Sequence, residues 1–346
     1  RDRSPSRGLG DVYKRQIFTP NGQFYLDYQQ DSKSLPNIYN YDPTEEVKDP
    51  ALQKLILGVQ GNIWCEWIPS RERMQYMTVP RMIAIAELGW SDPSQKNWDE
   101  FVQRLGSHFE RLNVMNINYR VPDLEGFNKT NAFIGEDSVT ISCIDPSAKV
   151  YYTTDGSTPT IESKEYTGPI HITETTDFKF RTFRANGKPS DTFETKFIKS
   201  EYAPATQAAP SNPGLKAVWH DFKGNKCEDI TKASVKGNYK IENVCIPQKV
   251  SGNIGLVITG YINVPEDDIY TFALLSDDGS TLVIDKEQVV DNDGPHGPRE
   301  VIGQKALAKG YHPIEIRYFD SNGGTLSLKV LNKQNKEIPF TNLYAH

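Results

Sequence analysis

The spacing of apolar residues along the chain changes twice, and these changes divide the chain into three parts. In the first part, apolar residues recur at steps of three and four from position 98 to position 112, which predicts an amphipathic helix. A nearly continuous apolar stretch at residues 82–88 predicts a second helix, capped by Thr78 and buried against a sheet. Two short apolar runs, at residues 24–28 and 58–64, predict strands that end in polar or aromatic side chains.

The second part begins near residue 131, where the period of the apolar pattern shortens to two. This alternation is typical of β-strands with one buried face. Asp155-Gly156 and Asn186-Gly187 are strong turn signals between the alternating segments. We therefore predict a small, fibronectin-like β-sandwich over residues 127–200.

The third part follows residues 201–213, whose Ala, Pro and Ser content is typical of a linker. Beyond the linker, short apolar segments recur between turns that are rich in Asp, Asn and Gly. They predict a second, larger β-sandwich over residues 214–346. Its expected strands are residues 255–262, 268–275, 281–284, 312–319 and 325–331.

The first part is predicted to be α/β. Its order of strand, loop, strand, helix and helix, with polar residues at the strand ends, is typical of a (β/α)8 TIM barrel. Residues 17–125 provide about 110 residues, whereas a complete barrel has roughly 250. The predicted fold class is therefore multidomain α/β plus all-β, in which the last strands and helices of a TIM barrel precede two β-sandwiches.

Residues 1–16 (RDRSPSRGLGDVYKRQ) are basic and have no apolar pattern, starting Met or signal-peptide core. They resemble translated adaptor sequence at the end of an assembled read. We interpret them as a non-native artefact and expect the native chain to extend further upstream.

Composition limits the classes of partner and cofactor. The formal net charge is -6, so we expect neither nucleic acid nor an anionic membrane surface as a partner. No run approaches the roughly 18 apolar residues that indicate a membrane span. The four cysteines show no metal-binding spacing. Cys227 and Cys245 lie in one segment, where they form either a disulfide or two separate buried thiols.

The candidate chemistry centres on residues 57–67, where a short apolar strand ends in a cluster of aromatic and acidic residues. Glu66 lies between Trp64 and Trp67, and such a carboxylate is poorly suited to a core. An indole face can stack on a pyranose ring, and a carboxylate accepts hydrogen bonds from sugar hydroxyls. Taken alone, Trp64 is more typical of a core residue, so the sugar-site hypothesis depends on its neighbours.

Several motifs resemble known families. Tyr25-Leu26-Asp27-Tyr28 and residues 60–66 (QGNIWCE) resemble the last two barrel strands of the family 20 glycoside hydrolases, the β-N-acetylhexosaminidases. Residues 80–90 (PRMIAIAELGW) are similar to the final barrel helix of that family. Residues 150–159 (VYYTTDGSTP) resemble the accessory sandwich of chitobiases and hexosaminidases, and residues 275–280 with 291–297 resemble a protective-antigen-type sandwich.

The resemblance implies a glycosidase that removes terminal N-acetylglucosamine or N-acetylgalactosamine by substrate-assisted retaining hydrolysis. Tyr25 would donate its hydroxyl to the acetamido oxygen of the substrate, which attacks the anomeric carbon. Asp27 and Glu66 would bind hydroxyls of the terminal sugar, and Trp64 would form the apolar floor beneath the ring. The implied partners are glycans ending in N-acetylhexosamine, and the implied location is the periplasm, the outer-membrane surface or the extracellular space.

The chain departs from the family in one respect. The family carries its acid in an Asp-Glu pair after a His-x-Gly-Gly stretch, and no such stretch is present. Asp99-Glu100 is the one Asp-Glu pair in the barrel-like part, where it lies in the expected first turn of the amphipathic helix and complements the helix dipole. We therefore expect this chain to be a fragment that is inactive by itself.

Two alternatives remain open. The chain could act as a carbohydrate-binding or adhesion protein through its sandwiches. Within the second sandwich, Asp277 and Asp278 could bind calcium with help from Asp285, Asp291 or Asp293, as in some adhesins of the protective-antigen type. The other interpretation of Asp277 and Asp278 is a tight hairpin turn, which we favour. We accordingly expect no cofactor and no metal ion.

Overall fold

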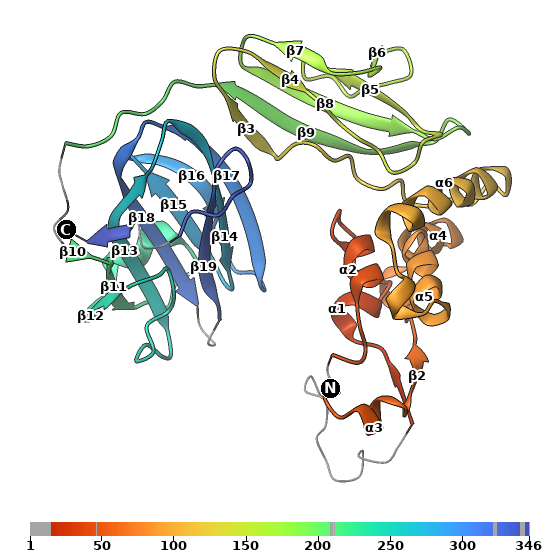
Figure 1. The fold of residues 1–346 in the computed structure, drawn as a ribbon, viewed down its shortest axis with the longest axis horizontal. Helices are drawn as coiled ribbons and strands as arrows, with labels where there is room; N and C mark the ends of the chain where they lie inside the picture. The colour runs from red at the N-terminus through yellow and green to blue at the C-terminus, as the bar shows by residue number, and fades with distance from the viewer. Residues whose placement is uncertain are drawn as a thin grey trace. The chain divides into compact units, whose positions relative to one another are not determined.

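A computed structural model describes residues 15–45, 47–207, 210, 212–320, 324–339 and 343–345. The chain is mostly β-structure, and its longer helices all precede residue 115 (Figure 1). Two compact units are present. The first comprises residues up to 126, with 140–169 and 179–193, and the second comprises 127–139, 170–178 and 194 onward.

The first unit begins with a helical part. Its helices are α1 (Asn21–Phe24), α2 (Ser34–Asn40), α3 (Pro50–Gln53), α4 (Arg71–Thr78), α5 (Arg81–Trp90) and α6 (Trp98–Val114), with short 3-10 turns η1 (Cys65–Trp67) and η2 (Pro93–Gln95). Two strands, β1 (Gln16–Phe18) and β2 (Ile56–Val59), pair in parallel.

Helix α6 confirms the predicted amphipathic helix. The Asn97 side chain caps it by accepting the N–H groups of residues 99 and 100. Its apolar stripe buries Phe101, Leu105 and Phe109. The ring centroids of Phe101 and Tyr39 in α2 are 4.7 Å apart, so the stripe packs against α2, which follows the segment that carries Tyr25 and Asp27.

Two local predictions in this part are wrong. Residues 24–28 do not form a strand, because Phe24 ends α1 and only Tyr25 makes a β-bridge. Thr78 ends α4 instead of capping α5, since Pro80 has no N–H with which to continue a helix. Of residues 1–16, interpreted as an artefact, residues 1–14 lie outside the described residues, and Gln16 begins β1 and pairs with Ile56; the interpretation stays a prediction.

The barrel prediction is not confirmed. The described residues of this part form one two-stranded parallel sheet and the helices around it. The order of a strand followed by helices is compatible with a piece of an α/β domain, and the barrel itself stays a prediction.

The predicted small sandwich has two sheets. A five-stranded sheet has the order β3-β9-β8-β5-β6, and β4 pairs with β7. Gly156 and Gly187 have φ angles of 83° and 81°, so both Gly-containing turn signals are confirmed. The strands are β3 (Thr130–Phe133), β4 (Asp137–Val139), β5 (Lys149–Thr153), β6 (Lys164–Glu165), β7 (Ile170–Ile172), β8 (Thr176–Phe183) and β9 (Pro189–Lys199).

The second unit contains the larger sandwich. Its strands are β10 (Asn212–Pro213), β11 (Leu215–Asp221), β12 (Val235–Ile241), β13 (Ile254–Val264), β14 (Asp268–Ser276), β15 (Ser280–Ile284), β16 (Glu287–Asn292), β17 (Arg299–Leu307), β18 (Gly310–Asp320), β19 (Leu326–Leu331) and β20 (Leu343–Ala345), and η3 is Cys227–Lys232. All five expected strands are present, and the strands that the sequence analysis did not name are β10, β11, β12, β16, β17 and β20.

Two sheets enclose the core of this sandwich. The eight-stranded sheet runs β10-β20-β13-β18-β15-β16, with β11 and β12 joined at β13, and the smaller sheet has the order β17-β14-β19. Apolar side chains of both sheets form one buried cluster, which includes Leu256, Ile258 and Ile316 of the first sheet and Phe272 and Leu274 of the second. Burial of this cluster is the main favourable term in the stability of the module.

The predicted linker is not free along its whole length. The N–H of Ala203 donates to the carbonyl oxygen of Ala306 (3.0 Å), and the N–H of Thr206 donates to that of Tyr311 (2.8 Å). The first part of residues 201–213 therefore lies along the ends of β17 and β18 as an added edge.

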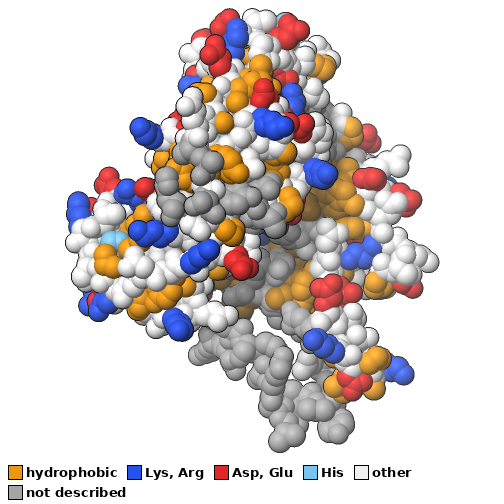
Figure 2. All heavy atoms as spheres, turned by 60° about the vertical axis from the view of Figure 1, so that its left-hand side comes forward, with side chains coloured by type: hydrophobic (Ala, Val, Ile, Leu, Met, Phe, Trp, Pro, Cys, Tyr) orange, Lys and Arg blue, Asp and Glu red, His pale blue; other side chains and the backbone are white. Residues whose placement is uncertain are grey.

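The surface carries charges of both signs (Figure 2), and the cysteines form no disulfide. On the face in Figure 2, Lys and Arg side chains are interspersed with Asp and Glu side chains. All four cysteines are free thiols, so the disulfide alternative for Cys227 and Cys245 is wrong for this structure. No helix in the described part of the chain has the length and apolar character needed to cross a membrane.

Truncation of Leu105 tests the packing of α6. Leu105 is fully buried, so we expect Leu105→Ala to lower the free energy of unfolding by about 2–5 kcal/mol through lost burial and a residual cavity. Denaturant unfolding followed by tryptophan fluorescence measures the change. Gln103→Ala on the exposed face of α6 is the control and should stay within about 0.5 kcal/mol. Equal effects of the two substitutions would contradict the packing.

Candidate functional site

The segments that carry Tyr25 and Trp64 lie side by side. The N–H of Leu26 donates to the carbonyl oxygen of Asn62 (2.7 Å), and the N–H of Asn62 donates to that of Phe24 (2.8 Å). These bonds make a parallel bridge at Tyr25 that continues the direction of the β1–β2 pair. Residues from two distant segments are thereby aligned at one edge.

Tyr25 and Trp64 meet at this edge. Their ring centroids are 5.8 Å apart, and the ring of Tyr28 lies 5.7 Å from that of Tyr25. Trp64 is 48% exposed, so it is not the core residue that a lone tryptophan would suggest. Three aromatic rings thus form a partly open apolar surface beside polar groups, which is suited to one face of a sugar ring.

Asp27 follows Tyr25 by two residues in the same segment. Its side chain is buried, and its Oδ1 has no hydrogen-bond partner among the described residues. A buried carboxylate oxygen of this kind is costly unless a donor reaches it. The positive charge of Arg81 interacts with Asp27, and no hydrogen bond between the two side chains is present in the described part of the chain.

Arg81, at the start of α5, holds the segment that carries Tyr25 and Asp27. Its Nη2 donates to the carbonyl oxygens of Leu26 (2.7 Å) and Tyr28 (3.1 Å), and its Nε donates to that of Met77 (3.1 Å). Burial lowers the pKa of Arg81 to about 10, so the guanidinium stays charged at neutral pH. The sequence analysis missed this role, although an arginine within an otherwise apolar helix start was a visible signal.

Glu66 is not brought to the other three residues. It lies in η1 and is exposed, and among the described residues no hydrogen bond or ion pair joins it to Tyr25, Asp27 or Trp64. The neighbours of Glu66 are exposed as well. Cys65 is an exposed thiol, and Trp67 is 73% exposed.

Asp99 and Glu100 lie in the first turn of α6, as predicted. Their backbone N–H groups donate to Asn97 Oδ1, and the Asn97 amide donates to Glu100 Oε1 (3.3 Å). This is a helix-capping arrangement, and it assigns the pair to the helix end.

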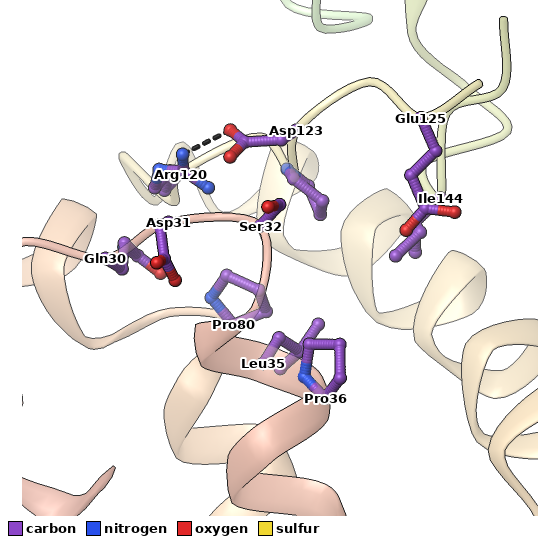
Figure 3. Close-up of a pocket in the computed structure, with 11 residues that line it drawn as sticks. Gln30, Asp31, Ser32, Leu35, Pro36, Pro80, Arg120, Asp123, Glu125 and Ile144 are labelled. Atoms are coloured by element: carbon purple, nitrogen blue, oxygen red, sulfur yellow. Dashed lines mark hydrogen bonds and ion pairs between the residues drawn. The ribbon is translucent and has the colours of Figure 1, made fainter. Parts of the chain in front are cut away.

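A small hollow opens near the segment that follows Asp27 (Figure 3). It is lined by Asp31, Pro80, Asp123 and Glu125, among others, and its volume is about 20 Å³. A space of this size holds about one water molecule. It is therefore too small for a sugar ring.

A second constellation lies in the larger sandwich. Oxygen atoms of Asp277, Asp278 and Asp320 lie within 4.8 Å of one another. The predicted hairpin turn at residues 277–279 is wrong, because β14 pairs with β17 and β19 whereas β15 pairs with β16 and β18. Residues 277–279 instead cross from one sheet to the other. Asp320, at the end of β18, was missed, since sequence alone does not show which strand ends meet.

The surroundings hold this acidic cluster in place. The N–H of His296 donates to Asp278 Oδ1 (3.1 Å), and the Tyr318 hydroxyl donates to the carbonyl oxygen of Asp277 (2.7 Å). Burial, together with the charges of Asp278 and Asp320, raises the pKa of Asp277. Closely spaced carboxylate oxygens are ligands that calcium accepts, so the donor set fits that cation.

The other acids considered as ligands are engaged elsewhere. Asp285 Oδ2 lies 2.8 Å from His312 Nδ1. Asp291 Oδ1 accepts the N–H of Asp293, and Asp293 Oδ1 accepts the N–H of Cys227 (2.9 Å). The cluster therefore consists of three acids, of which the sequence analysis named two.

Comparison with known proteins identifies three families along the chain. Residues 12–93 match the catalytic domain of glycosyl hydrolase family 20. Residues 129–195 match the chitobiase/beta-hexosaminidase C-terminal domain, and residues 211–342 match the PA14 domain.

Individual relatives agree with these matches. A beta-hexosaminidase of Porphyromonas gingivalis is 28% identical over 86% of this chain and 41% of its own length. One from Vibrio furnissii is 41% identical over 20% of this chain and 13% of its own length. Among solved structures, a PA14 sugar-binding domain from an RTX adhesin has a TM-score of 0.35 and 15% identity, covering 39% of this chain and 99% of that domain.

The chain thus spans less than half the length of these two relatives. The families match in the order in which the sequence motifs were met, and the first match contains Tyr25, Asp27, Trp64 and Glu66. The chain is therefore similar, in order, to the catalytic domain of glycosyl hydrolase family 20, to the chitobiase/beta-hexosaminidase C-terminal domain and to the PA14 domain.

Proposed function

We propose that this chain is part of a β-N-acetylhexosaminidase that removes terminal N-acetylhexosamine from glycans by substrate-assisted hydrolysis. The observation that carries the proposal is the parallel bridge at Tyr25 and Asn62, which aligns two distant sugar motifs. Glycan substrates favour action in the periplasm, at the outer-membrane surface or outside the cell.

Each residue of the aligned edge has a role in this proposal. Tyr25 donates its hydroxyl to the acetamido oxygen of the substrate, which attacks the anomeric carbon in place of an enzyme carboxylate. Asp27, whose buried Oδ1 lacks a donor, accepts a hydrogen bond from a hydroxyl of the terminal sugar. Trp64 stacks beneath the ring, and Glu66 binds a second hydroxyl once the substrate brings the two together.

The chain by itself is expected to be inactive. Its one Asp-Glu pair in this part lies in the first turn of α6, so within the described residues this pair is not available to protonate the leaving oxygen. Release of nitrophenol from 4-nitrophenyl N-acetyl-β-glucosaminide should not exceed the blank. An active beta-hexosaminidase serves as the positive control. Turnover that Tyr25→Phe abolishes would contradict the expectation.

Replacement of Trp64 tests the sugar floor. Loss of a stacked indole should weaken N-acetylglucosamine binding at this site by about 1 kcal/mol, a factor of roughly five. Saturation-transfer NMR in the presence of a chelator measures the binding. Trp90→Ala is the matched control, because Trp90 is 92% exposed and lies outside the aligned edge. The sugar floor is disproved if the two substitutions behave alike.

A second candidate function belongs to the PA14 domain. The convergence of Asp277, Asp278 and Asp320 favours calcium-dependent sugar binding, in which the three carboxylates would hold the ion. When bound, the ion supplies a Lewis-acidic contact for sugar hydroxyls. The protein then acts as a binding protein through this domain, with or without the hydrolase.

Calcium titration tests this candidate. We expect saturable binding at neutral pH that Asp278→Asn weakens at least about tenfold, because a charged ligand is lost. As the pH is lowered, calcium affinity should begin to fall at a pH above the usual pKa range of an aspartate. The reason is that the pKa of Asp277 is raised and the protonated carboxyl does not bind the ion. Asp291→Asn, a nearby exposed acid outside the cluster, is the control for isothermal calorimetry. Absence of calcium heat at neutral pH would rule the site out.

A further inference from the structure

The first unit contains a second polar hollow, which the proposed hexosaminidase site does not use. Its volume is about 230 Å³, against about 20 Å³ for the hollow that holds about one water molecule. Three segments line it, namely Tyr76 near the end of α4, residues 118–123 after α6, and residues 184–193 at the turn from β8 into β9. All three segments belong to the same compact unit.

Arg184 forms the floor of this hollow and is held flat. Its Nη1 donates to the carbonyl oxygens of Ile117 (3.3 Å) and Tyr119 (3.1 Å), and its Nη2 donates to Asn118 Oδ1 (3.0 Å). The guanidinium carbon lies 4.8 Å from the centre of the Tyr119 ring. Arg184 is 5% exposed, and no carboxylate within the described ranges lies at ion-pair distance from it.

The walls carry one more cation and two anions. Arg120 pairs with Asp123, as Figure 3 also shows from the adjoining small hollow. The Tyr76 hydroxyl donates to Asp191 Oδ2 (2.6 Å), and Asp191 itself is exposed at the rim. The hollow is therefore lined by two guanidinium groups and two carboxylates, whose formal charges cancel at neutral pH.

The equal numbers of positive and negative groups indicate which class of ligand the hollow can bind. An anion would face Asp123 and Asp191, and a cation would face Arg120 and Arg184, so either would meet repulsion as well as attraction. A neutral polyol uses both sets, because each hydroxyl donates one hydrogen bond and accepts others. The rings of Phe193 and Pro189 add apolar surface beside these groups, as sugar rings require.

We propose that this hollow is a second carbohydrate-binding site, in which Arg120, Asp123 and Asp191 bind the hydroxyls of a neutral sugar. The proposal depends on the geometry of this hollow and not on the hexosaminidase function. Tyr76 also links the hollow to the first site. The Arg73 guanidinium lies 5.4 Å from its ring and donates to Gln29 Oε1 (2.9 Å), and Gln30 Nε2 donates to the Tyr76 carbonyl oxygen (2.7 Å).

The test uses the whole chain carrying Trp64→Ala, in a chelating buffer, so that neither the aligned edge nor a calcium site contributes. The probes are the methyl β-glycosides of N-acetylglucosamine, glucose and galactose, followed by saturation-transfer NMR. We expect saturable binding of at least one probe with a Kd on the order of millimolar. Asp191→Ala should weaken it at least about tenfold, since a charge-assisted hydrogen bond is lost.

Two variants make the result interpretable. Glu162→Ala removes an exposed acid outside the hollow and should leave the Kd unchanged. Asp191→Asn keeps the shape of the side chain and should also weaken binding, so the test survives a folding defect in the alanine variant. The proposal is overturned by absence of binding up to about 50 mM of all three sugars, by an unchanged Kd in both Asp191 variants, or by sodium acetate or sulfate occupying the hollow instead.

Discussion

The arrangement of the first site depends on the buried guanidinium of Arg81. The segment that carries Tyr25 and Asp27 has only one β-bridge, so most of its carbonyl oxygens have no strand partner. Arg81 donates to two of them and to the end of α4, which replaces sheet hydrogen bonds by the rigid fork of one side chain. Because a buried carbonyl without a donor is costly, the segment, α4 and α5 are held as one piece.

The sequence correctly predicted the helices and strands whose apolar pattern extends over many residues. Helix α6 was found because its stripe persists over several turns, and β13, β14 and β18 because their apolar runs are long. Helix α4 was missed because its eight residues are largely polar and bury only Met77 and Thr78. The prediction of a strand at residues 24–28 was wrong because backbone carbonyl oxygens of that segment accept hydrogen bonds from the Arg81 side chain. The spacing of apolar residues carries no information about such a partner.

The sites were predictable only in part. Tyr25, Asp27, Trp64 and Glu66 were named from motifs, and the structure aligns Tyr25 with Trp64 while leaving Glu66 apart. Asp320 and the arginines around the second hollow were not named, because their positions depend on which strand ends and loops meet. The burial of a charged side chain in this protein depends on which segments the fold brings together. A carboxylate or guanidinium shows its environment only when segments far apart in sequence are placed together.

The crossing at residues 277–279 has a consequence for how the larger sandwich would respond to a bound ion. Asp277 and Asp278 follow the central strand of the three-stranded sheet, whereas Asp320 ends a strand of the eight-stranded sheet. An ion held by all three carboxylates would be a cross-link between the two layers of the sandwich. Ion binding would then stabilise the packing of the two sheets, and that packing would in turn be required for ion binding. The stability of the sandwich would therefore depend on whether the ion is bound.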